Sequence, residues 1–111
     1  MESKNIQIVI KEASIEDVYE LRKCNKDCLP VYYPYGVYTN FIESNKSIVL
    51  IAKYNNNIIG YIIGEINMEY SDRFHIISFG VCNKFRKNKI GTVLMNKIIE
   101  MVQKKYLNTT K

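Results

Sequence analysis

The stretch from Ile76 to Met95 constrains the fold more than any other part of the chain. Its first part is apolar and β-branched, which is typical of a buried strand, and it ends near Val81. Apolar residues then recur at the spacing of one helix face, at Ile90, Val93, Leu94, Ile98, Met101 and Val102. The sequence therefore predicts a strand, a tight turn and a helix.

The turn in this stretch is basic, because it contains Lys84, Arg86, Lys87 and Lys89. Unpaired backbone N–H groups and the positive pole of the helix dipole lie at a helix N-terminus, and both attract anions such as a pyrophosphate. The cations strengthen that field. A net charge of +5 also indicates an anionic partner, either a phosphate-bearing cofactor, a nucleic acid or a ribosome surface. The alternative is a solvated basic crossover without a ligand.

The remaining elements follow from hydrophobic periodicity and from turn residues. Ser14, with Asp17 three positions later, is typical of a helix start. We predict strands over 6–11, 47–54, 58–69 and 73–81, helices over 15–29, 36–44 and 90–105, and turns over 55–57 and 70–72. This order predicts a single domain over residues 1–111, of the α/β (α+β) class, with a mixed sheet and helices packed on its faces.

The three cysteines, Cys24, Cys28 and Cys82, form no C-x-x-C pair. We expect reduced thiols in a cytoplasmic protein. Cys24 and Cys28 would share a helix face, but scattered cysteines with one histidine make a poor zinc set, so we expect no metal. No apolar run reaches the roughly 18 residues of a membrane span, and we expect no membrane association.

The turn Arg86–Gly91 resembles the arginine/glutamine-x-x-glycine-x-glycine/alanine turn of the GCN5-related N-acetyltransferase (GNAT) superfamily, with Lys89 at the family's first glycine. The predicted element order is similar to that of the family over essentially the whole chain. The resemblance implies the acyl-CoA N-acyltransferase fold in its N-terminal part, β-α-α-β-β-β-α. It also implies that acetyl-coenzyme A binds with its pyrophosphate on the turn. Lys89 would either crowd the phosphates or supply one more cation.

Two segments, Leu29–Tyr33 and Arg73–Val81, are similar to those of protein N-alpha-acetyltransferases of the Nat E type. This resemblance implies acetylation of the α-amino group of protein N-termini. The implied acceptor-binding residues are Leu29, Pro30, Val31, Tyr33 and Ile77. The implied cofactor-binding residues are Phe79, Gly80, Val81, Arg86, Lys87, Asn88, Lys89, Ile90, Gly91 and Thr92.

His75 is the only histidine, and a histidine pKa near 6.5 suits a general base. The resemblance places it where the subfamily has a catalytic tyrosine. By strand alternation we expect it to share a face with Ile77, Phe79 and Val81. Its Cα lies roughly 20 Å from that of Val81 in an extended strand, so we expect it to act through ordered water. The alternative is a structural, half-buried histidine.

Members of the family continue beyond the helix predicted over 90–105, so we expect this chain to lack the C-terminal third. An open edge on the fourth strand would then suit a homo-oligomer, and an auxiliary subunit or the ribosome is a further expected partner. Two other functions stay open: a GNAT enzyme acting on lysine or a small amine, and a non-enzymatic nucleic-acid or ribosome-binding module. Only the enzymes require affinity for coenzyme A.

Overall fold

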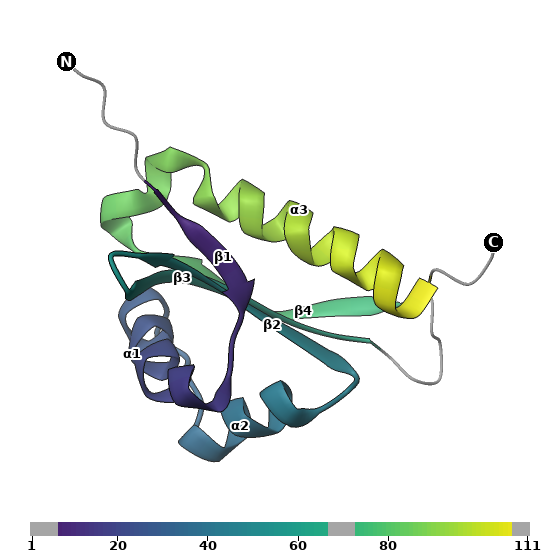
Figure 1. The fold of residues 1–111 in the computed structure, drawn as a ribbon. Coiled ribbons are helices and arrows are strands. Elements are labelled where there is room, and N and C mark those ends of the chain that lie inside the picture. The colour runs from purple at the N-terminus through teal and green to yellow at the C-terminus, as the bar shows by residue number, and fades with distance from the viewer. Residues whose placement is uncertain (1–6, 67–72, 108–111) are drawn as a thin grey trace.

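The computed structural model describes residues 7–66 and 73–107. An antiparallel sheet in the order β1-β2-β3-β4 separates α1 and α2 on one face from α3 on the other (Figure 1). The strands are β1 (Val9–Glu12), β2 (Ser47–Tyr54), β3 (Asn57–Ile66) and β4 (Phe74–Val81). The helices are α1 (Val18–Cys28), α2 (Tyr35–Glu43) and α3 (Ile90–Val102), with short turns of 3₁₀ helix over Ile15–Asp17 and Asn83–Asn88.

The predicted α+β fold and element order are confirmed. The first strand starts at Val9 rather than at residue 6, and α3 ends at Val102, where a π-helical turn over Gln103–Leu107 follows. All pairings among the described strands are antiparallel, so they include no parallel pair of the kind that a mixed sheet contains. The predicted end of the third strand and the turn over 70–72 lie outside the described residues.

Each face of the sheet has its own hydrophobic core, because the apolar strands β2 and β3 carry buried side chains on both faces. The core on the α3 face contains Leu50, Ile62, Ile90, Leu94 and Ile98. The core on the opposite face contains Val18, Leu21, Tyr38, Ile51 and Tyr61. Of the helices in the described part of the chain, none is both long and apolar enough to cross a membrane.

A β-bulge interrupts β4 before it reaches the basic turn. Ile63 lies opposite Ser78, whereas the next residue of β3, Gly64, lies opposite Ile76. Ile77 is therefore an extra residue on β4, and side chains on the two sides of it no longer alternate in simple order. The Ser78 hydroxyl is buried and lies 2.9 Å from the hydroxyl oxygen of Tyr61.

Candidate functional site

The basic turn joins β4 to α3 as the sequence predicts. A 3₁₀ turn over Asn83–Asn88 leads to Lys89, which adopts the left-handed conformation with φ 61° and ψ 22° and caps α3. The lysine thus occupies a backbone conformation that glycine adopts without strain. The backbone N–H groups at the start of α3 have no carbonyl one turn earlier, so this end of the helix can bind an anion.

The end of β4 presents backbone groups at the edge of the sheet. The N–H of Cys82 donates to the carbonyl of Ile59 on β3, and backbone direction alternates along a strand, so the N–H and carbonyl of Val81 point away from β3. The Val81 carbonyl accepts a hydrogen bond of 2.9 Å from Nε of Arg86. The Phe79 N–H points the same way by the same alternation. Among the described strands β4 pairs only with β3, so this edge is open there.

A pocket of about 360 Å³ lies between the end of β4 and the start of α3. It is lined by the predicted cofactor-binding residues Phe79, Gly80, Val81, Arg86 and Gly91, together with Cys28 and the predicted acceptor-binding residue Leu29. Gly91 lies against the Phe79 ring, and a Cβ at Gly91 would be 3.2 Å from Phe79 Cζ. The fold therefore brings together residues from three parts of the sequence.

The other predicted cofactor-binding residues lie around this pocket. Thr92 lines an adjoining hollow that also contains Phe79 and Gly91. Lys87, Asn88 and Lys89 are exposed on the turn, where long cationic side chains can reach a bound anion. The side chain of Ile90 is buried in the core under α3, so only its backbone is available to a ligand.

The loop between α1 and α2, which contains four of the predicted acceptor-binding residues, is fixed by a hydrogen-bond network. The buried Tyr38 hydroxyl donates to Oδ1 of Asn25 at 2.6 Å and accepts from the backbone N–H of Tyr33 at 3.2 Å. Nδ2 of Asn25 donates to the Val31 carbonyl at 3.1 Å, and Nε of Arg22 donates to the Tyr33 carbonyl at 2.7 Å. This network holds the loop backbone in one conformation.

The predicted acceptor-binding residues are not all gathered in one pocket. Leu29 lies in the pocket at the end of β4, whereas Pro30 and Val31 are exposed on the loop. The Tyr33 ring packs edge-on against Tyr38 and is partly buried in the core on the α1–α2 face. Ile77 packs against that same core from β4.

Of the three residues predicted to share a face of β4 with His75, one does and two do not. Ile77 belongs to the α1–α2 face, and His75 lies opposite Glu65 on that face, but Phe79 and Val81 pack on the α3 face. The bulge at Ile77 causes the difference, since it adds a residue and so reverses the alternation. His75 is exposed.

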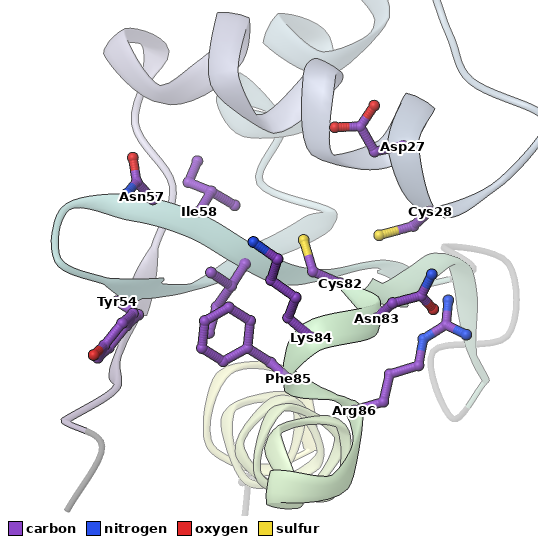
Figure 2. A pocket seen from close by; sticks show the side chains of 11 residues that line it. Asp27, Cys28, Tyr54, Asn57, Ile58, Cys82, Asn83, Lys84, Phe85 and Arg86 are labelled. Carbon is purple, nitrogen blue, oxygen red and sulfur yellow. The ribbon is translucent and has the colours of Figure 1, made fainter. Parts of the chain in front are cut away.

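A cluster of three thiols lies next to these residues, although they appeared scattered in the sequence. The Sγ atoms of Cys24, Cys28 and Cys82 are all within 4.8 Å of one another. Figure 2 shows Cys28 and Cys82 side by side in the lining of a pocket of about 500 Å³, with the Cys28 sulfur directed toward the Cys82 side chain, and Lys84 and Arg86 line the same pocket. Burial is the main cause that raises the pKa of the Cys24 and Cys28 thiols.

Comparison with known proteins defines the class. Residues 15–111 match the Acetyltransferase (GNAT) family, so the chain belongs to this family of N-acetyltransferases, whose members use acetyl-coenzyme A. The chain is 24% identical over 106 residues to an N-alpha-acetyltransferase of Sulfurisphaera tokodaii, covering 87% of this chain and 64% of that protein. It is 31% identical over 90 residues to the catalytic subunit of the N-terminal acetyltransferase A complex of Arabidopsis thaliana, covering 79% and 47%.

Solved structures agree on the fold. The PaiA N-acetyltransferase of Thermoplasma acidophilum in complex with coenzyme A superposes with a TM-score of 0.78 at 20% identity, covering 90% of this chain and 74% of that one. Compared with the two curated relatives described above, the chain spans only 64% and 47% of their length.

Proposed function

We propose that this protein transfers the acetyl group of acetyl-coenzyme A to the α-amino group of protein N-termini. The observation that carries the proposal is the pocket at the end of β4, where the turn residues Arg86 and Gly91 meet Leu29 of the loop between α1 and α2. A single pocket thus connects the basic turn to Leu29 of the apolar loop. Relatives named N-alpha-acetyltransferase support the choice of acceptor.

The turn would hold the cofactor through its charge and its backbone. The free N–H groups at the start of α3 bind the pyrophosphate, and Arg86, Lys87 and Lys89 add positive charge around it. The outward backbone groups of Phe79 and Val81 bind the extended arm, and the Val81 N–H stabilises the oxyanion that develops during transfer. Acetyl-coenzyme A itself supplies the acetyl group as a thioester.

The acceptor would approach from the α1–α2 face. Leu29, Pro30, Val31 and Tyr33 form the wall for the first residue of the peptide, and Ile77 adds apolar surface from β4. His75 lies on this same face and, through ordered water, takes the proton that the amine must lose before it attacks the thioester. The peptide N-terminus is therefore held between the loop and β4.

Isothermal titration calorimetry of the chain with coenzyme A tests the cofactor site. Arg86→Glu should weaken binding by about 100-fold or more, because it places a negative charge beside the pyrophosphate. Lys97→Glu makes the same charge change further along α3, on a residue that pairs with Glu100, and should leave the affinity within about threefold. Equal effects of the two substitutions would place the cofactor elsewhere.

Acetylation assays test the acceptor. Peptides with a free N-terminal amine and an apolar first residue should be acetylated, and the same peptides with a blocked N-terminus should not. Acetylation of lysine side chains in blocked peptides, or of polyamines, at equal rates would instead identify an enzyme for lysine or small amines. Absence of coenzyme A binding would favour the basic nucleic-acid-binding module.

The proposed partners follow from the same site. A protein N-terminus is the acceptor, and an auxiliary subunit or the ribosome would present it. Pairing of the β4 edge with a second copy would give the predicted homo-oligomer. Analytical ultracentrifugation at several protein concentrations measures that association. The cytoplasmic location and the single-domain organisation remain predictions.

A further inference from the structure

The three cysteines lie where the end of α1 and the end of β4 come close together. Cys24 and Cys28 are four residues apart on α1 and so share one face of the helix, and Cys82 follows the last residue of β4. All three sulfur atoms lie within 4.8 Å of one another. Two ligands spaced by one helical turn, with a third from a facing element, form a recurrent arrangement of protein metal sites.

The spacing of the sulfur atoms suits a metal ion bound to thiolates. A zinc–sulfur bond is about 2.3 Å long, so two sulfur atoms on one tetrahedral ion are separated by about 3.8 Å. The three cysteines therefore need side-chain movements on the order of 1 Å or less to reach that geometry. Rotation about the Cα–Cβ bonds of the half-buried Cys28 and Cys82 supplies such movements.

The surroundings allow an ion to enter and balance its charge. Cys28 and Cys82 line the pocket of about 500 Å³ (Figure 2), so the cluster is open on that side. Cys24 is 4% exposed and lies on the buried side of the cluster. Three thiolates around a divalent ion leave a net charge of −1, and around a monovalent ion −2. Lys84 and Arg86, which line the same pocket, offset this negative charge.

We propose that Cys24, Cys28 and Cys82 form a binding site for one thiophilic d¹⁰ cation, Zn²⁺ or Cu⁺. Soft thiolate ligands select these ions over hard cations such as Mg²⁺. On binding, each thiol gives its proton to solvent, three metal–sulfur bonds form, and no group is oxidised or reduced. The bound ion links the end of α1 to the end of β4, directly before the turn that begins at Asn83.

Titration of the reduced 111-residue chain tests this site, with Cd²⁺ as the spectroscopic probe and with Zn²⁺ and Cu⁺ in competition against chelators. One equivalent of Cd²⁺ should produce thiolate-to-metal charge-transfer absorbance and protect all three thiols from a thiol reagent. It should also raise the melting temperature. The chelator competitions show which of the two biological ions binds more tightly.

Substitutions distinguish the cluster from isolated thiols. Cys28→Ala and Cys82→Ala each remove one ligand and should weaken Cd²⁺ binding by more than about tenfold. His75→Asn removes the only histidine of the chain and should leave the affinity unchanged. Circular dichroism verifies that each variant is folded, and thiol protection in the unsubstituted chain gives an independent result if one is not.

Three results would overturn the proposal. The first is protection of fewer than three thiols by saturating Cd²⁺. The second is equal affinity of the native chain and the urea-unfolded chain, which would show that folding does not assemble the site. The third is isolation of the protein with a Cys28–Cys82 disulfide, together with a failure of the thiols to bind metal after that disulfide is reduced. This result would identify a redox pair instead.

Discussion

Nε of Arg86 donates a hydrogen bond of 2.9 Å to the carbonyl oxygen of Val81, five residues earlier in the chain. This bond folds the basic turn back on the end of β4, at the edge where the N–H of Val81 is also directed outward. The same side chain thus fixes the turn and contributes positive charge to the pocket that it lines.

Arg86→Lys separates these two contributions, since lysine keeps the charge but lacks the planar guanidinium that reaches the Val81 carbonyl. We expect coenzyme A affinity about 5- to 10-fold below that of the unsubstituted protein, which corresponds to about 1–1.4 kcal/mol for one hydrogen bond. Calorimetry should place the variant between the unsubstituted protein and Arg86→Glu. Affinity as low as that of Arg86→Glu would show that the hydrogen bond, not the charge, controls the turn.

Substitution of Lys89 tests the strain in the turn. Lys89 has φ 61°, a conformation that costs a residue with a Cβ about 1 kcal/mol and glycine little. Lys89→Gly should therefore raise the free energy of unfolding by about 1 kcal/mol, whereas the β-branched Lys89→Val should lower it. Urea denaturation measures both changes. A Lys89→Gly variant of lower stability would show that the side chain contributes more than its backbone strain costs.

Tyr38→Phe tests the network that fixes the loop between α1 and α2. Loss of the hydroxyl leaves Oδ1 of the buried Asn25 and the N–H of Tyr33 without these partners, which should cost about 1–3 kcal/mol. The acceptor KM should rise more than kcat falls, because the loop loses its fixed conformation. Tyr19→Phe, at a side chain that is 79% exposed, is the matched control and should change neither quantity.

Asp17 should make stability depend on acid pH. Burial raises the pKa of this carboxyl, but hydrogen bonds from Ser14 and the charges of Lys11 and Lys53 outweigh burial and lower the pKa below 3.8. The carboxylate therefore stabilises the fold fully above about pH 4, and this contribution disappears as the pH falls through the lowered pKa. Asp17→Asn should reduce the free energy of unfolding by about 1–2 kcal/mol at pH 7.

Urea denaturation at several pH values tests the assignment of Asp17. The stability difference between the unsubstituted protein and Asp17→Asn should decrease as the pH falls below about 4. Asp27→Asn is the control, because it removes the charge of an exposed carboxylate near the end of α1. A constant difference from pH 7 to pH 2 would show that the loss comes from packing and not from the charge.

His75→Phe tests the proposed proton transfer. We expect kcat for peptide acetylation to fall by about 10²–10⁴-fold, with little change in coenzyme A affinity, because the imidazole lies on the acceptor face and away from the turn. Unchanged kcat would show that His75 takes no part in the proton transfer and would assign the base to another group.

The sequence alone determined the order of the elements and the position of the basic turn. Apolar periodicity located β2 at Ser47–Tyr54, and the start of α3 at Ile90, because these elements depend on local burial patterns and on local turn chemistry. Asn55 and Asn56 adopt positive φ in the hairpin, as asparagine at this place predicts. The contact between Ser14 and Asp17 at the start of the first helix was also predictable, because the two residues are only three positions apart in the sequence.

Only the tertiary structure decided which side chains meet. The bulge at Ile77 reverses the faces of β4, and a one-residue register shift between β3 and β4 depends on packing across the sheet rather than on the sequence of either strand. The meeting of Cys82 with Cys24 and Cys28 likewise depends on how α1 crosses the sheet. Spacing along the chain contains no information on that distance, because residues far apart in sequence come together only when the layers pack.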